Sequence, residues 1–373
     1  MSQLKLACPT LFGLESIVAD EIRQLGYDRV TSTNGRVMFE TDELGIARAN
    51  INLRCAERVM VLIGEFEATS FEQLFQNVKA MPFEQWICKD DEFPVKGWSL
   101  NSALHSVPDC QSIIKKAVVE RLKLKYKIDW FSETANKVQI QFSIMKNLVS
   151  VYLDTSGEGL HKRGYRENAN EAPLKETLAA AMIMLSRFDG ERAFYDPFCG
   201  SGTILIEAAM IASNMAPGLY RRYSAEKWSS LNKDIWTKAR NEALDKIIKK
   251  PMIVQGYDID EAAVRLTLEN AKKAGVGSIV TAICQDIKQF APTEPRGVIV
   301  CNPPYGERML EIKEAEDLYR QMGRVISPLH GFNLYVISAS ERFENLFGRP
   351  CDKKRKLYNG MIKCELFQYF RGR

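Results

Sequence analysis

The second half of the chain alternates short apolar runs with amphipathic stretches, and few folds accommodate such a pattern. Five runs are short and apolar enough to form buried strands: residues 193–198, 252–260, 280–286, 297–302 and 332–340. Four other stretches carry apolar residues at helical spacing: residues 175–188, 202–213, 261–275 and 318–327. Because parallel strands need crossover connections, this alternation predicts a mostly parallel α/β sheet with helices on both faces. We expect this domain to occupy residues 174–373.

The end of the chain departs from the alternation. Residues 354–370, KRKLYNGMIKCELFQYF, form two strand-like runs around Asn359-Gly360. An Asn-Gly pair suits the positive φ angles of a type I′ turn, which joins neighbouring antiparallel strands. The sequence therefore predicts that an antiparallel hairpin closes the parallel sheet.

The first 155 residues predict two smaller α+β modules, over residues 1–65 and 66–155. The first module has alternating strand and helix candidates at residues 4–8, 11–26, 35–41, 43–54 and 58–68. The second has a helix, a strand, a long helix with Asp109 as its N-cap and a hairpin around Lys146-Asn147, at residues 71–81, 98–105, 109–127 and 137–155. A polar link that contains glycine, residues 156–173, separates these modules from the α/β domain.

The composition excludes several classes of protein. A net charge of +4 over 373 residues does not by itself require a nucleic-acid partner. The nine cysteines include no CxxC pair, so we expect no metal site and reduced thiols in a cytoplasmic protein. The amino terminus has no signal-peptide pattern, and no apolar run reaches the length of a membrane span.

The stretch DPFCGSGT, residues 196–203, lies between a predicted strand and a predicted helix. Gly200 and Gly202 allow the backbone to pass close to a ligand, and the helix that follows offers free N–H groups. Asp196 at the start of the turn would repel a pyrophosphate but attract an ammonium group. The GxxxxGK[ST] phosphate loop is absent, which argues against an NTPase.

Two further acids end the next strands. Asp258 in GYDID could accept hydrogen bonds from a ribose diol, and Asp286 in CQDI could accept one from an adenine amine. Asp260 is better placed as a helix N-cap. Each acid taken alone could equally be a loop carboxylate. Their placement at successive strand ends, where open α/β sheets bind ligands, favours the functional interpretation.

The motif NPPY, residues 302–305, ends the fourth strand, because neither proline can donate to a strand ladder. The Asn302 amide oxygen and the Pro303 carbonyl can both accept hydrogen bonds from an exocyclic amine on a planar ring. They would orient that amine toward an arriving methyl group. Tyr305 can stack on a planar base. These residues predict methyl transfer to a base amine.

Together, DPFCGSGT, GYDID and NPPYGER resemble the motifs of S-adenosylmethionine-dependent amino-methyltransferases. With GLHKRGYR and EAPLKETLAAA, the chain is more narrowly similar to the THUMP-containing RNA guanine-N2 methyltransferases of RlmL type, as their amino-terminal half standing alone. The resemblance covers nearly all residues. It implies a ferredoxin-like module (1–65), a THUMP RNA-binding domain (66–155), a linker (156–173) and a Rossmann-like class I methyltransferase domain (174–373).

The resemblance also implies the site residues. The cofactor S-adenosylmethionine would contact Asp196, Gly200, Gly202, Asp258, Asp286 and Asn302. The target guanine would contact Asn302, Pro303 and Tyr305. We expect a guanine N2 amine of 23S rRNA, or of a large-subunit precursor, to be methylated. A tRNA guanine, a DNA adenine, a protein glutamine or a non-catalytic role in RNA assembly are the alternatives.

Basic clusters give separate support for an RNA partner, although a solvated helix face could also explain them. Candidate RNA contacts come from the long helix, the linker and the tail: Lys115, Lys116, Lys162, Arg163, Arg166, Lys353, Lys354 and Arg355. The basic and aromatic insert at residues 214–240 could either touch RNA or cover the sheet.

Overall fold

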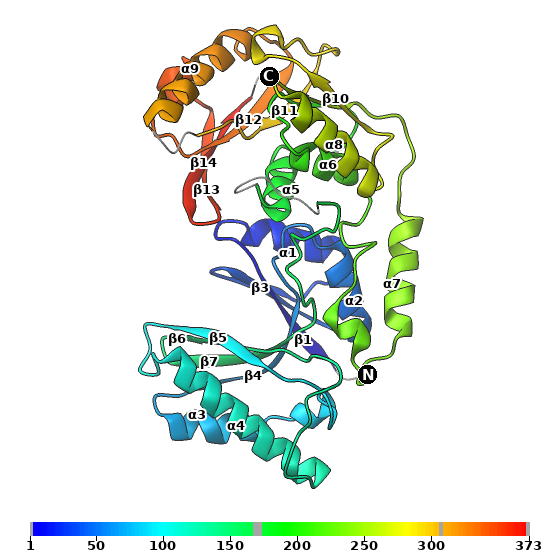
Figure 1. Ribbon diagram of the computed structural model, residues 1–373, viewed down its shortest axis with the longest axis vertical. Coiled ribbons are helices and arrows are strands. Elements are labelled where there is room, and N and C mark those ends of the chain that lie inside the picture. The colour runs from blue at the N-terminus through cyan, green and yellow to red at the C-terminus, as the bar shows by residue number, and fades with distance from the viewer. Residues whose placement is uncertain (1–2, 167–173, 306–308, 371–373) are drawn as a thin grey trace.

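The computed structural model describes residues 3–166, 174–305 and 309–370, and it places them in two sheets at opposite ends of an elongated molecule (Figure 1). Part of the predicted linker, residues 167–173, and the GER of NPPYGER, residues 306–308, lie outside the described residues. No described helix is long and apolar enough to cross a membrane.

The first sheet has seven described strands in the order β2-β3-β1-β4-β7-β6-β5. Their bounds are β1 Leu4–Pro9, β2 Val30–Thr33, β3 Arg36–Thr41, β4 Met60–Glu67, β5 Val95–Leu100, β6 Ile140–Met145 and β7 Leu148–Asp154. The helices of this part are α1 Glu15–Gln24, α2 Glu43–Asn52, α3 Phe71–Ala80, η1 Phe83–Gln85 and α4 Val107–Tyr126.

Strand β4 joins the two modules that the sequence predicts as separate. It pairs antiparallel with β1 through Leu6↔Val61 and Ala7↔Met60, and with β7 from Met60 to Glu67 with a register shift between Leu62 and Gly64. The predicted boundary at residue 65 therefore falls inside a strand shared by both modules. Because β4 pairs with β1 on one side and with β7 on the other, the two modules form one continuous sheet.

The second sheet has seven described strands in the order β10-β9-β8-β11-β12-β14-β13. Their bounds are β8 Ala193–Asp196, β9 Val254–Asp258, β10 Val280–Cys284, β11 Gly297–Cys301, β12 Phe332–Ser338, β13 Lys353–Asn359 and β14 Ile362–Tyr369. The helices are α5 Glu176–Leu185, α6 Thr203–Ala212, η2 Ser224–Lys227, α7 Asp234–Asp245, α8 Glu261–Lys273, η3 Ile287–Gln289, α9 Met309–Ile326 and α10 Phe343–Phe347. The first five strands in this order pair in parallel, and the last two are antiparallel, which confirms the predicted layout.

Helices cover both faces of the second sheet, and the alternation along β11 shows how. Val298 and Val300 belong to the core cluster that includes α5 and α6. Ile299 and Cys301 belong to the cluster that includes α9 and α10. Because successive side chains of a strand point to opposite faces, an unbroken apolar run indicates burial on both sides. The apolar run GVIVC is such a run.

Both predicted hairpins are present, with different turns. Lys146 and Asn147 have φ angles of +52° and +68°, as a type I′ turn requires. In the second hairpin Asn359 still pairs with Ile362, and positive φ occurs at Gly360 (+62°) but not at Asn359. The predicted type I′ turn at Asn359-Gly360 was therefore wrong. Glycine stands first in the two-residue loop, as in a type II′ turn.

Other predicted boundaries also shift. The short strand β2, Val30–Thr33, was not predicted. Helix α4 begins at Val107 with Ser106 as its N-cap, so Asp109 lies in the first turn and is not the cap. Asp260 is the N-cap of α8, as predicted, and accepts a hydrogen bond from the Ala262 N–H. Helix α9 begins nine residues before the predicted start at 318.

The basic insert at residues 214–240 packs on the first part of the chain and does not cover the second sheet. Helix α7, which begins in the insert, lies beside α2 (Figure 1), where Arg48 forms two 2.7 Å hydrogen bonds with Glu242. The Trp228 indole N–H donates to the Lys137 carbonyl at 2.9 Å. The insert therefore connects the α/β domain to both amino-terminal modules.

Candidate cofactor and target-base site

The predicted site residues meet at one edge of the second sheet. From β8 the chain proceeds to β9 and β10 on one side, and from β11 to β12 on the other. The strand order therefore reverses between β8 and β11, and open α/β sheets bind ligands at such a point, beyond the carboxyl ends of the strands. Asp196 ends β8, Asp258 ends β9 and Asn302 directly follows β11. The structure brings these three residues to the same edge.

The glycine turn between β8 and α6 leaves room for a ligand. Gly200 and Gly202 have φ angles of +52° and +83°, which favour glycine. A Cβ atom on Gly202 would lie 2.9 Å from Thr267 Cγ2, so this glycine allows α8 to approach. A Cβ atom on Gly200 would meet nothing within 4 Å. The backbone at Gly200 therefore borders open space beside the end of β9.

Two polar side chains of α8 hold this turn, and the sequence did not single them out. The buried Thr267 hydroxyl donates to the Gly200 carbonyl at 2.8 Å. The buried Asn270 amide donates to the Ser201 carbonyl at 2.9 Å. These residues are three apart, so they share a helix face. In the sequence, these two polar residues on the apolar side of the predicted helix could have indicated that they contact the turn.

Asp196 is buried, and this changes its acidity. Its residue is 1% exposed, and Oδ1 accepts a hydrogen bond from the Phe198 N–H at 3.0 Å. Burial raises the pKa of the Asp196 carboxyl to about 8, with a smaller contribution from the negative charge of Asp258. A cation placed against this carboxyl would favour its ionised form. The site thus has a preference for an ammonium group.

Asp258 links the end of β9 to the glycine turn. Its Oδ2 accepts from the Gly200 N–H at 2.9 Å, and its Oδ1 accepts from the Asp260 N–H at 3.0 Å. Asp286 caps η3, since its Oδ1 accepts from the Lys288 N–H at 2.9 Å. A carboxylate offers about four acceptor sites, so each acid keeps capacity for a ligand hydroxyl or amine. Both cofactor roles stay predictions.

Asn302 and Pro303 begin the segment that follows β11. Asn302 is half-buried and Pro303 is buried. The Tyr305 hydroxyl donates a hydrogen bond to Asn302 Oδ1, and the Tyr319 hydroxyl donates to the Pro304 carbonyl at 3.0 Å. Because an amide oxygen has two lone pairs, the Tyr305 bond fixes the Asn302 side chain and leaves one lone pair for another donor.

The Tyr305 side chain is partly buried, and its predicted stacking on the target base stays a prediction. The ring packs against the core cluster on the α5 side of the sheet. Burial raises the pKa of the Tyr305 hydroxyl well above its usual range, with a smaller contribution from Cys364. Because the Tyr305 hydroxyl bonds to Asn302 Oδ1, Tyr305 also positions the Asn302 side chain.

Comparison with known proteins identifies the chain. A family model described as the RMKL-like methyltransferase domain matches residues 163–368, a model of the RlmL ferredoxin-like domain matches residues 5–60, and a THUMP domain model matches residues 68–154. "Putative RNA methyltransferase YpsC" of Bacillus subtilis (strain 168) is 44% identical over 99% of this chain and 97% of its own length. The chain belongs to the RMKL-like methyltransferase family.

Solved structures agree over the whole chain. A "possible methylase" from Clostridium difficile 630 superposes with a TM-score of 0.96 at 44% identity, covering 100% of this chain and 99% of its own. SMU.472, described as a putative methyltransferase complexed with SAH, superposes with a TM-score of 0.94 at 38% identity, covering 100% of this chain and 99% of its own. The domain types and the fold predicted from the sequence are thereby confirmed.

This RMKL-like methyltransferase uses S-adenosylmethionine as its cofactor. The residues at the sheet edge fit that group. The buried Asp196 carboxyl suits the cofactor ammonium, and the open space at Gly200 accommodates its passage along the turn. Asp258 retains acceptor sites for ribose hydroxyls.

Two linker arginines predicted to contact RNA lie inside the protein. Arg163, whose side chain is 2% exposed, pairs with the fully buried Glu207 of α6 at 3.2 Å. Arg166 donates to Glu176 at 2.7 Å and to the Thr203 hydroxyl at 3.1 Å. A buried charge needs an internal partner, and the acids of α5 and α6 supply it. These arginines tie the linker to the helix after the glycine turn. The burial of Arg163 is not compatible with its predicted RNA contact, whereas Arg166 is half-buried and its RNA contact stays a prediction.

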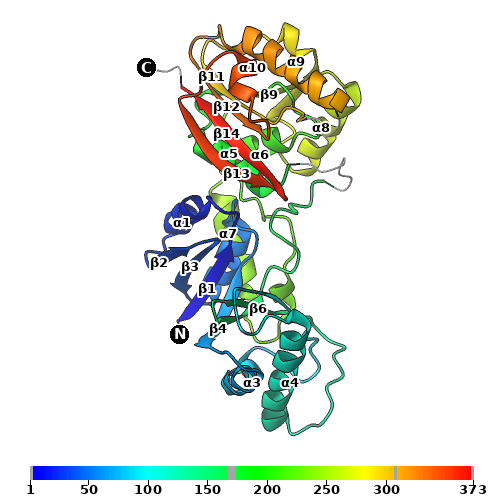
Figure 2. The same cartoon turned by 90° about the vertical axis from the view of Figure 1, so that its left-hand side faces the viewer.

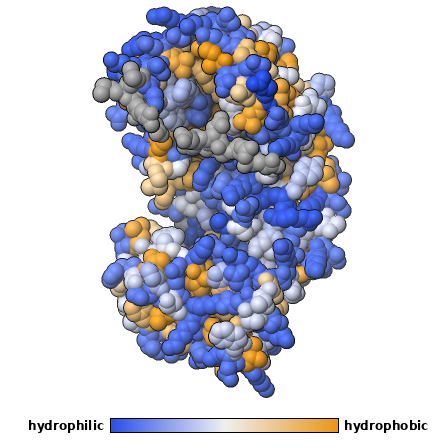
Figure 3. Space-filling view, in the orientation of Figure 1, coloured by the Kyte–Doolittle hydropathy of each residue, from blue (hydrophilic) through white to orange (hydrophobic). Residues whose placement is uncertain are grey.

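The other predicted RNA contacts divide into two groups. Lys115 forms an ion pair with Glu133 at 2.6 Å, and Lys354 pairs with Glu344. Their charges are partly neutralised by these partners. The remaining four reach the surface or a cavity: Lys116, Lys162, Lys353 and Arg355. Two of these four also have partners, since Lys162 pairs with Glu158 at 3.2 Å and the Arg355 guanidinium donates to the Gly13 carbonyl. Figure 3 shows hydrophilic side chains over most of one face of the molecule, with apolar side chains in scattered groups.

Proposed function

We propose that this protein transfers a methyl group from S-adenosylmethionine to the exocyclic N2 amine of a guanine in RNA, and that the RNA is 23S rRNA or a large-subunit precursor. The observation that carries the proposal is the position of Asn302. It follows β11 directly, beside the glycine turn of the neighbouring strand β8. A methyl donor at the turn and an amine at Asn302 would therefore meet at one edge.

For this methyl transfer, the main task of the protein is to orient the target amine toward the methyl group. When bound, the cofactor supplies an electrophilic methyl group on its sulfonium. The guanine N2 lone pair is delocalised into the ring, so the amine is a poor nucleophile. Acceptance of its two N–H bonds by Asn302 Oδ1 and the Pro303 carbonyl would favour the pyramidal form and direct its lone pair. One N–C bond forms as the S–CH₃ bond breaks, and the amine proton then leaves to water.

Two features support an RNA substrate. The THUMP domain match covers residues 68–154, and the resemblance of the sequence motifs implies RNA binding by such a domain. The relative from Bacillus subtilis is named as a putative RNA methyltransferase at 44% identity over nearly the full chain. A DNA adenine or a protein glutamine would present an amine to the same acceptors, so the substrate must be measured directly.

The test uses the purified protein, S-adenosylmethionine with a labelled methyl group, and total RNA from a strain that lacks the gene. The RNA fractions are digested to nucleosides, and the labelled product is identified by mass spectrometry. We expect N2-methylguanosine in 23S rRNA or in precursor particles. The same nucleoside in tRNA would overturn the ribosomal assignment. Label found only in DNA or protein would overturn the RNA assignment.

A further inference from the structure

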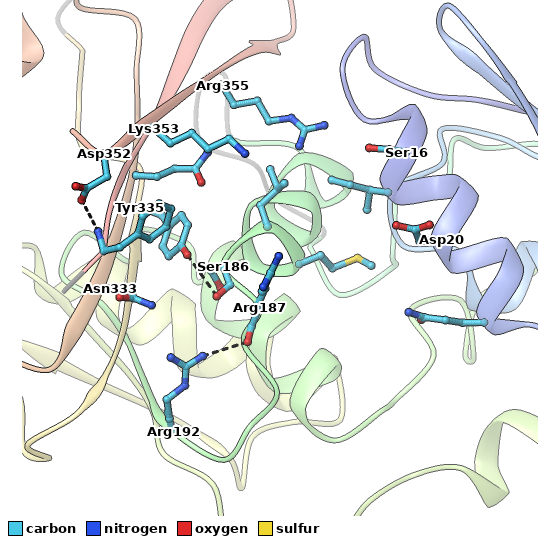
Figure 4. A pocket seen from close by; sticks show the side chains of 16 residues that line it. Ser16, Asp20, Ser186, Arg187, Arg192, Asn333, Tyr335, Asp352, Lys353 and Arg355 are labelled. Carbon is cyan, nitrogen blue, oxygen red and sulfur yellow. Dashed lines mark hydrogen bonds between the residues drawn. The ribbon is translucent and has the colours of Figure 1, made fainter. Parts of the chain in front are cut away.

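A cavity of about 1020 Å³ lies between α1 and the second sheet, away from the methyl-transfer site (Figure 4). It is bordered by α1, by the end of α5 and by strands β12, β13 and β14. Asn333 and Tyr335 line it from the first half of β12, whereas Asn302 follows the last residue of the neighbouring strand β11. Tyr335 pairs with Val300 and Asn333 pairs with Val298, so these two lining residues lie about 7 Å and about 13 Å along the strand from the level of Asn302.

Four basic side chains line the cavity. They come from two segments of the chain, the connection between α5 and β8 and the strand β13: Arg187, Arg192, Lys353 and Arg355. In Figure 4, Lys353 and Arg355 extend from the hairpin, while Arg187 and Arg192 lie across from them. Figure 2 shows the same hairpin, β13 and β14, in a second view, where it projects toward the first sheet.

The acidic lining residues have partners of their own. Asp20 pairs with Arg23 at 2.7 Å, outside the lining. Asp352 accepts a hydrogen bond from the Phe370 N–H at 2.7 Å and lies 3.5 Å from Arg349. Because these two carboxylates are already engaged, they neutralise the four cations only in part. The cavity is therefore an environment for an anion.

Gln368 supplies a further donor. It is 4% exposed, and its Nε2 atom has no hydrogen-bond partner. Along β14 it lies in the same row as Leu366, which belongs to the core on the α5 side. Buried polar groups normally have partners, and an unpaired amide N–H costs free energy. A ligand oxygen in the cavity would satisfy this N–H.

The backbone conformation of Arg187 also supports a ligand site at the cavity. Arg187 follows α5 with a φ angle of +54°, a left-handed conformation in which glycine is the usual residue after a helix. Its carbonyl accepts from the Arg192 guanidinium at 3.1 Å, so the two arginines are held together. Residues in unfavourable backbone conformations occur often at ligand sites, and Arg187 is such a residue at the border of this cavity.

The tail motif KKRK is divided by the pleat of β13. Lys353 and Arg355 face the cavity, while Lys354 faces the opposite side and pairs with Glu344. Two aromatic rings complete the wall, since Tyr335 and Phe370 meet edge to face at 6.1 Å, and Phe370 is 41% exposed. Guanidinium groups bind phosphate oxygens, and an exposed ring can stack on a base.

We propose that this cavity binds a phosphodiester of the substrate RNA strand, with Arg187 and Arg355 on the phosphate oxygens and Phe370 against an adjacent base. This inference rests on the proposed function, since it takes RNA as the substrate. A single strand is favoured over a duplex because only an unpaired base can reach the Phe370 ring. The cavity would hold the strand at a fixed distance from the nucleotide at Asn302.

The test compares full-length wild-type protein with the double variant Arg187→Gln, Arg355→Gln. The matched control is Arg324→Gln, which removes an exposed charge from α9 on the other side of the sheet. Fluorescence anisotropy with a labelled single-stranded RNA oligonucleotide gives the affinity at several salt concentrations. Loss of both arginines from one phosphate should reduce the salt slope by about 0.7 and weaken binding more than tenfold. Cofactor binding, measured by calorimetry, should not change.

Steady-state methylation separates this inference from the proposed function. A raised KM for RNA with unchanged kcat in the double variant supports the cavity. Wild-type methylation of RNA with no change of KM or salt slope in the variant overturns the cavity and leaves the proposed function standing. A third outcome is a wild type that binds RNA but methylates none, with weaker RNA binding in the variant. This outcome supports the cavity and overturns the proposed function.

Two further measurements do not depend on the variants. RNA carrying 4-thiouridine should crosslink to the wild-type peptide that contains Phe370, and crosslinks only elsewhere would overturn the proposal. Competition with inorganic phosphate and with guanosine monophosphate distinguishes a strand from a free nucleotide. Micromolar binding of the mononucleotide that leaves RNA affinity unchanged would assign the cavity to a small ligand and overturn the RNA assignment.

Discussion

The buried carboxyl of Asp196 should make cofactor binding depend on pH. Its pKa is raised to about 8, mainly by burial, and the ionised form is the one that attracts the cofactor ammonium. With this value, roughly 1% of the carboxyl is ionised at pH 6, about 10% at pH 7 and about half at pH 8. Because only about a third to a half of the ligand keeps its α-ammonium charge at pH 8, affinity should rise about 20-fold between pH 6 and pH 8.

Above pH 8 the trend should reverse. An α-amino group has a pKa of about 7.7–8.0, so the ligand itself loses its charge in this range. The affinity of the wild-type protein for S-adenosylhomocysteine, which keeps the ammonium, should peak near pH 8 in isothermal titration calorimetry. Asp196→Asn should bind more weakly at pH 8 and lose the rise from pH 6. Asp260→Asn, at the exposed cap of α8, is the control that keeps it.

Fold stability without cofactor should change in the opposite direction. A carboxyl whose pKa is higher in the folded than in the unfolded state destabilises the fold as pH rises from about 4 to about 8. The melting temperature of the wild type should fall relative to that of Asp196→Asn as the pH rises over that range. A wild-type affinity that is flat between pH 6 and pH 8, or a rise that persists in Asp196→Asn, would refute the reasoning.

Three substitutions test other contacts. Asn302→Ala should lower kcat at least about 100-fold while the calorimetric affinity for the cofactor stays the same, and equal loss of both would contradict its role at the target amine. Thr267→Val removes the hydroxyl that holds the Gly200 carbonyl, so cofactor affinity should fall about fivefold, with Thr267→Ser restoring it. Arg163→Met leaves Glu207 buried and unpaired, which should lower the free energy of unfolding by about 3–5 kcal/mol in urea denaturation. An unchanged denaturation midpoint would count against that assignment.

The sequence predicted the second sheet well because its signals are local. An apolar run such as GVIVC indicates a strand buried on both faces, and a helix must follow before the next parallel strand. The same logic placed Asp196, Asp258 and Asn302 at one edge, because parallel strands gather their carboxyl ends there. The order of the strands in the sheet was known only from the structure.

What the sequence did not predict depends on contacts between distant segments. A basic residue in a polar link suggests exposure, but Arg163 is buried because Glu207, 44 residues later, faces it. The hydrogen bond from the Tyr305 hydroxyl to Asn302 Oδ1 was also not predicted, because the motif does not fix the direction of the Tyr305 side chain. Asn270 was hidden within an ordinary helical pattern, since its partner is a backbone carbonyl on another element.

The pairing of strand β4 affects which base of a long RNA substrate could reach Asn302. Because β1 and β7 both hydrogen-bond to it, the ferredoxin-like and THUMP parts cannot swing independently, and the Trp228–Lys137 bond anchors the insert of the methyltransferase domain to the same body. On the proposed function, the protein would select its target base by a fixed distance between the THUMP domain and Asn302. An RNA gripped at the THUMP end would present to Asn302 only a base at one set spacing along its fold, so a guanine shifted by a few nucleotides would stay unmodified even in an identical local sequence.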